Sequence, residues 1–458
     1  MKRIVIVGVL LVGMMTAVVE AAKPNILFLF ADDMRADSVG ALGNPTVKTP
    51  NIDSLVQRGF VFRNAYCFGG NSGAVCTPSR NMLLSGNAYF RWKGMLAPAV
   101  DSNWPIAMKT GGYETYHHGK KHNTAGLIQA QFEHNKYLKD DEAERRCGEP
   151  GKEIADSAMA FIKGEGRDTS RPFFMYLAFG NPHDPRVAAQ KYLELYKQEA
   201  IPLMKNYKPQ HPFNNGEMEV RDEKLSPWPR TEDEIRRTLH EYYATITGLD
   251  FHIGRILEAL KESGQIENTL VLFSADQGIA VGSHGLLGKQ NLYDAGMKVP
   301  LIFAGPGTSK GESDALVYLF DLFPTVAEMA DVSVPQGIDG KSFLPVMQGK
   351  AKSVRQELFL SYRHLQRAWR DDRWKIIRYP EVNVTQLFDL QNDPDELNDL
   401  SGSPEHKSRV AGMLDKMKAA QQVWGDSLAL EVADPKPAAW SPPEGKTKGG
   451  KKGQEVEK

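Results

Sequence analysis

Continuous apolar runs alternate with stretches of helical periodicity along the first two thirds of the chain. The runs with the length of a buried strand lie at residues 25–31, 173–179, 269–273 and 299–303. Helical periodicity is clearest at residues 231–263 and 318–330. Strands that are apolar on both faces and alternate with helices are typical of a mostly parallel sheet. The pattern therefore predicts an α/β fold, with a mostly parallel central sheet flanked by helices.

The pattern changes beyond about residue 340. Short strand-like runs at 357–362, 374–379 and 386–390 precede an amphipathic stretch at 406–423, which predicts a small antiparallel sheet with one helix. The irregular segment 201–229 is rich in Pro, Asn and Lys, and long insertions of this kind often carry function.

These changes in sequence pattern divide the chain into four predicted parts. The C-terminal part is rich in Pro, Gly and Lys and is expected to be disordered. The parts are an N-terminal signal peptide (1–22), a catalytic domain (23–340), a C-terminal α+β subdomain (341–434) and a disordered tail (435–458).

Polar residues follow three of the predicted strands. Asp32 and Asp33 follow the first run, His183 follows the second after a short turn, and Asp276 and Gln277 follow the third. Ligands of parallel sheets gather at the carboxyl ends of the strands, so these side chains are expected to share one site. An Asp-Asp pair alone could equally be a helix cap. Three carboxylates and an amide carbonyl favour a hard cation, and calcium accepts their irregular geometry best.

Composition narrows the class of partner. The chain has 458 residues, 41% of them hydrophobic and 25% charged, and a formal net charge of −1. The length indicates two or three folding units of an ordinary globular protein. A net charge near zero gives no reason to expect a nucleic acid or an acidic membrane as partner.

The N-terminus has the three zones of a secretory signal peptide. Met1-Lys2-Arg3 is charged, residues 4–19 are apolar, and Ala21-Ala22 supplies small residues for cleavage. An uncleaved anchor is the alternative, but the apolar run is short for one. We therefore expect an exported protein, periplasmic or secreted, with no membrane attachment after cleavage. Its three cysteines are an odd count, so at least one is unpaired or otherwise used.

One cysteine begins the pentapeptide Cys76-Thr77-Pro78-Ser79-Arg80. Proline is tolerated in the first turn of a helix, and the free amide groups there favour negative charge. The pentapeptide therefore predicts a nucleophile placed where an anion would bind. A buried cysteine that acts only as a small apolar side chain is the alternative.

Cationic and imidazole side chains complete the candidate chemistry. Lys120 and His122 lie in a Lys/His run, His183 lies between two prolines, and Lys289 lies in a glycine-rich loop. Each has an ordinary alternative, such as a solvated turn or a histidine bonded to its own backbone. Their order along the chain, together with the acidic strand ends and Cys76, is what indicates a catalytic site.

Together these motifs resemble the type I, formylglycine-dependent sulfatase family of the alkaline-phosphatase-like superfamily, over almost the whole mature chain. Its iduronate and choline sulfatase branch is the most similar in the spacing from Asp276 to Lys289. The other landmarks of the resemblance are Pro24-Asn25-Ile26, Thr49-Pro50-Asn51-Ile52-Asp53, Gly119-Lys120-x-His122, Pro182-His183, Val299-Pro300-Leu301-Ile302, Asp321-Leu322-Phe323-Pro324-Thr325 and Leu387-Phe388-Asp389-Leu390.

The resemblance implies that a maturation enzyme converts Cys76 to formylglycine, whose hydrate attacks sulfur. It also implies one calcium ion, held by Asp32, Asp33, Asp276, Gln277 and residue 76. Members of the family more usually carry Asn or His where this chain has Gln277, so the glutamine is the least secure ligand. Conversion of Cys76 would leave Cys67 and Cys147 either free or joined in a disulfide.

Roles for the remaining residues follow from the same resemblance and from charge. Asp276 would deprotonate the hydrate, which Arg80 orients, while Lys120 and Lys289 offset the charge of the sulfate. His183, helped by Lys289, would protonate the departing alcohol, and His122 would take the proton that releases sulfate.

Two alternatives stay open at this point. The first is a phosphonate or phosphodiester hydrolase of the same superfamily. The second is an unconverted, inactive carbohydrate-binding homologue, against which the cations argue. The substrate is expected to be a sulfated small molecule or oligosaccharide, contacted through Arg91-Trp92, residues 181–186 and the insertion 201–229. Trp92 could stack on a sugar or simply be buried.

Overall fold

The computed structural model describes residues 23–100 and 103–443. Within these residues nine strands form a mostly parallel central sheet. Across the sheet they are β10 (Gly311–Tyr318), β2 (Phe60–Tyr66), β9 (Leu301–Ala304), β7 (Thr269–Ala275), β1 (Asn25–Ala31), β6 (Phe173–Ala178), β4 (Glu114–Gly119) and β5 (His134–Tyr137), with β8 (Lys298–Val299) beside β2. The short strands β8 and β9 run antiparallel to their neighbours.

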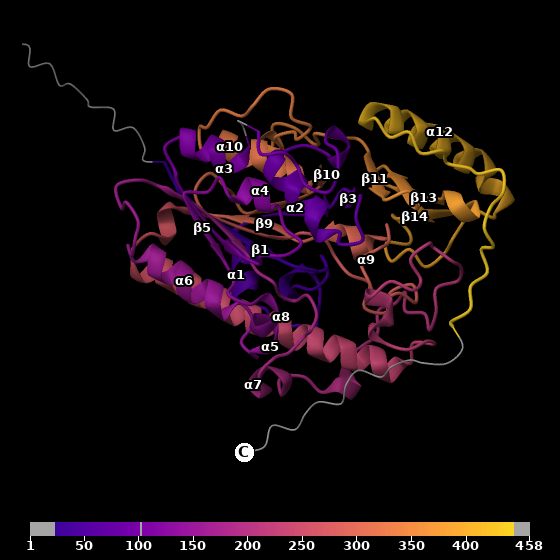
Figure 1. The fold of residues 1–458 in the computed structure, drawn as a ribbon, viewed down its shortest axis with the longest axis horizontal. Coiled ribbons are helices and arrows are strands. Elements are labelled where there is room, and N and C mark those ends of the chain that lie inside the picture. The colour runs from indigo at the N-terminus through magenta and orange to yellow at the C-terminus, as the bar shows by residue number, and fades with distance from the viewer. Residues whose placement is uncertain (1–22, 101–102, 444–458) are drawn as a thin grey trace, which may run out of the picture.

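Helices cover both faces of this sheet (Figure 1). One layer contains α1 (Pro50–Arg58), α6 (Lys152–Ile162), α7 (Gln190–Leu193) and α8 (Glu232–Glu262). The other contains α2 (Cys76–Ser85), α3 (Trp104–Thr110), α4 (Gly126–Gln129) and α10 (Leu322–Met329). Strand β1 lies at the centre with every residue buried, as the unbroken apolar run predicts.

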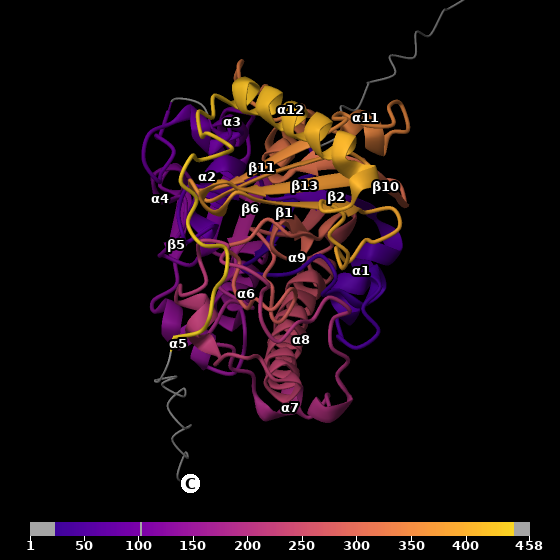
Figure 2. The same ribbon diagram turned by 90° about the vertical axis from the view of Figure 1, so that its right-hand side faces the viewer.

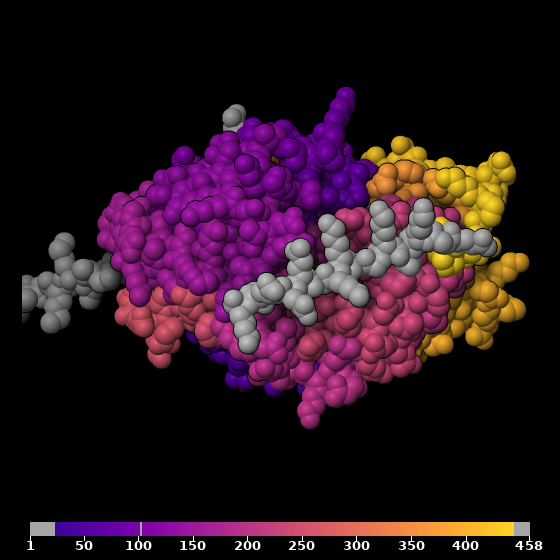
Figure 3. Space-filling model, turned by 60° about the horizontal axis from the view of Figure 1, so that its bottom comes forward, coloured from indigo at the N-terminus to yellow at the C-terminus, as the bar shows by residue number. Residues whose placement is uncertain are grey.

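Shorter helices lie in the connections. They are α5 (Asp141–Arg146), α9 (Asp294–Met297), α11 (Leu344–Met347) and the 3-10 turns η1 (Gly40–Leu42), η2 (Tyr89–Arg91), η3 (Gln198–Ala200), η4 (Asp222–Leu225), η5 (Ile266–Asn268), η6 (Leu319–Asp321), η7 (Pro380–Val382) and η8 (Pro404–His406). The insertion 201–229 is irregular apart from η4, as expected. Figure 3 shows the insertion and α8, in magenta to pink, beside the purple residues of the first half of the chain.

A second, smaller sheet carries the C-terminal part. Its order is β14 (Val384–Asp389), β13 (Trp374–Tyr379), β12 (Gln366–Arg370), β11 (Leu358–Tyr362) and β3 (Gly69–Gly70). The four C-terminal strands are antiparallel, and α12 (Lys407–Trp424) packs across them (Figure 2). This confirms the predicted fold class, a central α/β layer structure with a smaller antiparallel sheet and helix.

The two sheets are joined by a strand that the pattern does not predict. β3 has only two residues, both glycine, and pairs in parallel with β11 at Ser361 and Tyr362. Gly69 has φ 106°, and a Cβ there would lie 2.0 Å from the carbonyl oxygen of Ser361. Only glycine allows this approach, at a position seven residues before Cys76 in the chain.

Replacement of Gly69 by alanine is expected to destabilise the protein by about 2 kcal/mol or more, because it adds a steric clash to an unfavourable φ. Gly43 is the matched control, since it has φ 117° but nothing within 4 Å of the added Cβ. Gly43→Ala should cost about 1 kcal/mol. Equal losses for the two variants in denaturant unfolding would show that the close approach to Ser361 does not matter.

Two predicted elements differ in detail from the structure. The apolar run 299–303 is split into β8 and β9 at Pro300, which has no amide hydrogen for the ladder. The helical stretch predicted for 318–330 begins as the end of β10 and the turn η6, so that α10 starts at Leu322.

Residues 435–443 differ from the predicted disordered tail. They contain no helix or strand, but Trp440 lies edge-on to Trp228 and the carbonyl of Ala438 accepts a hydrogen bond from the amide of Asn214. The rest of that tail, and the predicted signal peptide 1–22, lie outside the described residues. Among the described residues, no helix is long and apolar enough to cross a membrane.

All three cysteines lie in the part of the chain that the structure describes, and none of them is paired there. Cys67 follows β2 and is buried, whereas Cys147 follows α5 and is exposed. Cys67 Sγ accepts from the amide of Gly69 at 3.4 Å, and Cys147 Sγ lies 3.0 Å from the carbonyl oxygen of Glu144. The disulfide left open for Cys67 and Cys147 therefore does not form.

Candidate active site

The site lies at the carboxyl ends of β1 and β7, which are neighbours in the central sheet. Their pairing places Ala31 opposite Ala275, so Asp32 and Asp276 leave the sheet side by side. The amide of Asp33 donates to Asp276 Oδ1 at 3.1 Å, and the amide of Asp32 donates to the carbonyl of Asn181 at 3.0 Å. The predicted gathering of strand ends is confirmed for these residues.

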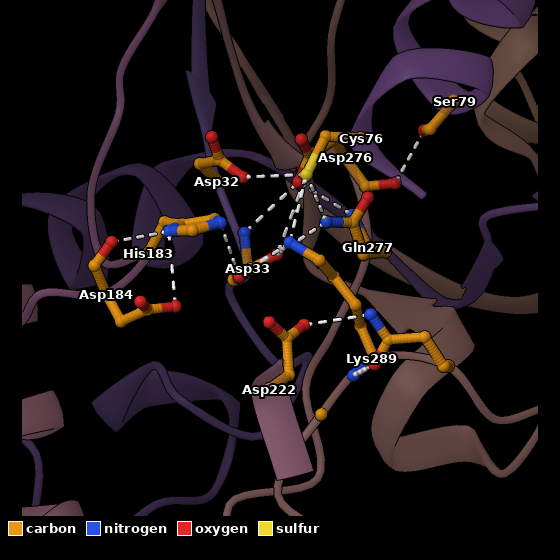
Figure 4. A network of polar contacts seen from close by, with 12 residues as sticks. Asp32, Asp33, Cys76, Ser79, His183, Asp184, Asp222, Asp276, Gln277 and Lys289 are labelled. Atoms are coloured by element: carbon orange, nitrogen blue, oxygen red, sulfur yellow. Dashed lines mark hydrogen bonds and ion pairs between the residues drawn. The ribbon is translucent and has the colours of Figure 1, made fainter. Parts of the chain in front are cut away.

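Helix α2 brings Cys76 to this edge (Figure 4). Cys76 is its first residue, and Pro78 lies within the first turn, where an amide hydrogen has no partner in the helix anyway. Every residue of α2 is buried, and Ser79 Oγ donates to the carbonyl of Asp276 at 2.6 Å. The helix is thus fixed to the end of β7, and Cys76 points at the cluster of carboxylates.

Four polar groups surround the Cys76 sulfur. Its Sγ lies 3.2 Å from Asp32 Oδ1 and 3.9 Å from Asp33 Oδ1. It also lies 3.0 Å from Gln277 Nε2 and 3.1 Å from Lys289 Nζ. Burial, followed by the nearby Asp276 and Asp32 carboxylates, raises the pKa of the Cys76 thiol well above its ordinary value. A reactive cysteine needs a lowered pKa, so the thiol as encoded is poorly suited to act as a nucleophile.

Buried cations balance the three carboxylates. Arg80 Nε donates to Asp276 Oδ2 at 2.9 Å, and its Nη2 lies 3.5 Å from Asp32 Oδ2. Lys120 Nζ donates to Asp32 Oδ2, and Lys289 Nζ donates to Asp33 Oδ1 at 2.8 Å. The exposed fraction of each side chain is 4% or less. Charges this deeply buried are costly unless they are paired or used.

The pKa values of Asp32 and Asp276 are shifted in opposite directions. Burial and then the charge of Asp32 raise the pKa of Asp276 to about 6, against the opposing effect of Arg80. Burial would also raise the pKa of Asp32, but Lys120 and Arg80 together hold it well below its ordinary value. Two neighbouring carboxyls with separated pKa values are a common arrangement where one must accept a proton and the other must stay charged.

The cluster fits a hard cation. Ligand atoms of Asp32, Asp33, Asp276 and residue 76 all lie within 4.8 Å of one another. Gln277 Oε1 is buried and has no hydrogen-bond partner among the described residues, while its Nε2 points at Asp33 Oδ1. A half-turn of the amide exchanges these two atoms and would bring the oxygen to the cluster. The donor set of carboxylate and amide oxygens is the one that calcium prefers.

His183 and Lys120 connect the cluster to a cavity of about 450 Å³. His183 Nε2 lies 3.7 Å from Asp33 Oδ2, and burial followed by the charge of Lys289 lowers the pKa of the imidazole. His122 lines the same cavity, but its side chain is 79% exposed and its Nδ1 contacts Asp141 Oδ2 at 3.0 Å. The structure therefore brings all the predicted site residues together except His122, which lies at the rim.

Trp92 and Arg91 have other contacts. Trp92 is half-buried against the hydrophobic core, and Arg91 pairs with Asp339. Two residues that the sequence indicated only as members of the segments 181–186 and 201–229 lie closer to the site. Asp184 adjoins His183, and Asp222 from the insertion faces Lys289 (Figure 4). The only signal for Asp222 was the length of the insertion that contains it.

A hydrolase of anionic esters is the class of protein that this fold and site define. The model of the family described as Sulfatase matches residues 24–332, and one described as N-sulphoglucosamine sulphohydrolase, C-terminal, matches residues 282–423. The chain belongs to the sulfatase family and is a sulfuric ester hydrolase.

A curated relative supports the family, and solved structures share the fold. The chain is 30% identical to an ulvan-active sulfatase of Formosa agariphila, over 89% of this chain and 82% of the relative. Its fold is similar to that of a protein solved with its substrate D-glucosamine-2-N,6-O-disulfate (TM-score 0.74, 22% identity, 88% and 99% coverage). It is also similar in fold to a phosphonate monoester hydrolase of Agrobacterium radiobacter (TM-score 0.74, 22% identity, 88% and 96% coverage).

Proposed function

We propose that this protein removes sulfate from a sulfated saccharide, using a formylglycine that a maturation enzyme forms from Cys76, with one calcium ion. The observation that carries the proposal is the setting of Cys76. It lies at a helix start among three buried carboxylates and two lysines, and its thiol pKa is raised, not lowered. That setting disfavours a thiolate nucleophile and suits a side chain that is converted to an oxygen nucleophile.

Calcium would be held by Asp32, Asp33, Asp276 and Gln277 together with residue 76. Hydrated formylglycine would supply one hydroxyl oxygen as the nucleophile and a second hydroxyl that releases the sulfate afterwards. Bound calcium would offset the charge of the sulfate. The remaining work falls to side chains of the protein.

Each of these side chains has a role set by its position. Lys120 and Lys289 would bind the sulfate oxygens, because both ammonium groups lie buried beside residue 76. Arg80 would hold Asp276 and residue 76 in place, and Asp276, with its pKa of about 6, would accept the proton of the nucleophile.

The two histidines would handle the other protons. His183 is buried between the cluster and the cavity, so it would donate to the leaving alcohol oxygen. His122 would take up the last proton, which requires its exposed side chain to turn inward from Asp141.

The saccharide part of the proposal is supported by the names of relatives and by the cavity. An ulvan-active sulfatase and a complex with a sulfated glucosamine are among the similar proteins. The cavity of about 450 Å³ beside Lys120 and His183 is within the ~300–1,000 Å³ range of small-molecule sites. Export is proposed with it, on the pattern of residues 1–22.

The experiment is a turnover assay of purified, converted protein on a panel of sulfated mono- and oligosaccharides, with phosphate and phosphonate esters of the same alcohols beside them. We expect kcat/KM for the best sulfate ester to exceed that for its phosphorus counterpart by about a hundredfold or more. The second candidate, a phosphonate monoester hydrolase, is favoured by the similar fold of one such enzyme. A reversed preference in the same assay would establish that candidate.

A further inference from the structure

Three consecutive residues of the insertion, Arg221, Asp222 and Glu223, hold two loops of the site; they are called the η4 triplet here. The loop after β6 carries His183, and the loop after β7 carries Lys289. We propose that the η4 triplet positions His183 and Lys289 relative to residue 76. The roles of those two cations rest on the proposed function, whereas the positioning is argued from contacts alone.

Glu223 binds the backbone of the Lys289 loop. Its Oε1 accepts from the amides of Leu287 at 3.0 Å and Gly288 at 2.8 Å. Its Oε2 also accepts from Leu287, at 3.0 Å, and from Arg230 Nη2 at 2.7 Å. The Glu223 side chain is 4% exposed and that of Arg230 is fully buried. The buried Glu223 carboxylate therefore holds the backbone amides of the two residues immediately before Lys289.

Asp222 adds a second hold on the same loop. Its Oδ2 accepts from Gln290 Nε2 at 2.9 Å, and Gln290 Oε1 accepts from the amide of Lys289 at 3.1 Å. Burial alone would raise the pKa of Asp222, but Lys289 and Arg221 lower it, so the carboxylate stays ionised. The loop lies so close that a Cβ on Gly288 would be 2.9 Å from Asp222 Cβ.

Arg221 holds the other loop. Its Nη2 donates to Asp184 Oδ1 at 2.6 Å and its Nε donates to Asp222 Oδ1 at 2.9 Å. His183 Nδ1 lies 2.6 Å from the Asp184 carbonyl oxygen and 3.4 Å from Asp184 Oδ1. Nδ1 is thus engaged away from the cluster, and Nε2 is the ring nitrogen that faces Asp33. When Asp184 is held in place, Nε2 is the ring nitrogen of His183 that can face the substrate.

The Lys289 loop needs such support because its backbone is strained. Val281 has φ 41° and His284 has φ 57°. A β-branched residue in the left-handed region is a rare and costly conformation that persists only where its surroundings hold it. The η4 triplet supplies buried, charge-assisted bonds to the end of this loop, where Lys289 must meet Asp33 and residue 76.

The first test uses Arg221→Met, because this side chain is 60% exposed and its loss should not unfold the protein. A displaced His183 matters only when the leaving group needs a proton. We expect kcat/KM to fall about tenfold or more for a sugar sulfate but less than about twofold for 4-nitrophenyl sulfate. Arg237→Met removes an exposed ion pair on α8 and is the matched control. Equal losses on both esters, or none, would overturn the positioning of His183.

The second test does not depend on activity. Glu223→Gln keeps the shape of the side chain but weakens its bonds to the amides of Leu287 and Gly288. Hydrogen exchange measured by mass spectrometry in peptides covering residues 284–290 should become about tenfold faster in this variant and stay unchanged in Arg221→Met. Unchanged exchange in Glu223→Gln would overturn the positioning of Lys289.

The two tests separate failure of the inference from failure of the proposed function. A wild-type protein that cleaves no sulfate ester contradicts the proposed function, and hydrogen exchange then still decides whether Glu223 holds the loop. If Glu223→Gln does not fold, Asp222→Asn replaces it, since it keeps an oxygen for Gln290 and removes only the charge facing Lys289. That variant should lower kcat/KM about tenfold on both esters alike, and an unchanged value would count against the inference.

Discussion

Replacement of Cys76 by serine is expected to lower kcat at least about a thousandfold while leaving the fold intact. The proposed nucleophile is an oxygen of the hydrate formed from a converted cysteine. An unconverted serine lacks the second hydroxyl that the hydrate uses to release sulfate. Steady-state kinetics with the best sulfate ester of the panel, together with thermal unfolding, would measure both effects.

Cys147→Ser is the matched control for this variant, because Cys147 is an exposed cysteine outside the cluster around residue 76. It should retain full activity. Substantial turnover by Cys76→Ser, or an equal loss in Cys147→Ser, would contradict the assignment of residue 76.

Removal of calcium is the second change with a large expected effect. The wild-type protein should bind one calcium ion per chain, and free calcium at about 100 times Kd should stabilise it by about 2.7 kcal/mol. Asp33→Asn should weaken calcium binding by about a hundredfold or more, because it removes one of three negative charges from the buried cluster. Isothermal titration calorimetry and thermal unfolding with and without a chelator measure these changes without any turnover.

Asp37→Asn is the control for Asp33→Asn. Asp37 is a nearby carboxylate whose side chain is 60% exposed and pairs with Arg35. Its removal should leave calcium affinity unchanged. Equal weakening by both substitutions would point to general electrostatics instead of a ligand at Asp33.

The strands that the sequence predicted are those whose buried positions are filled mainly by apolar side chains. The strand predicted at 25–31 is apolar without a break from Ile26 onward and forms β1 with the same bounds. β12 was missed because its polar residues are buried through ion pairs such as Arg367 with Asp426, which no hydrophobic pattern records. β3 was missed because two glycines carry no pattern at all.

The sequence predicts the site residues whose positions follow from the topology of the sheet. It does not predict those whose positions depend on contacts of single side chains. Asp32 and Asp276 follow neighbouring parallel strands, so their meeting is a consequence of the sheet. The outward position of His122 depends on its contact with Asp141, which comes from a helix nineteen residues further on. Asp222 lies in a segment without periodicity, and its place beside Lys289 follows only from the folded insertion.

The state of residue 76 in active protein tests the central claim most directly. Trypsin releases residue 76 in the peptide 64–80, which also contains Cys67, so tandem mass spectrometry must locate any change. We predict a peptide in which residue 76 has lost H₂S in exchange for one oxygen, while Cys67 is unchanged, in amounts that follow the sulfatase activity of each preparation. An unmodified cysteine at position 76 in fully active protein would contradict the account.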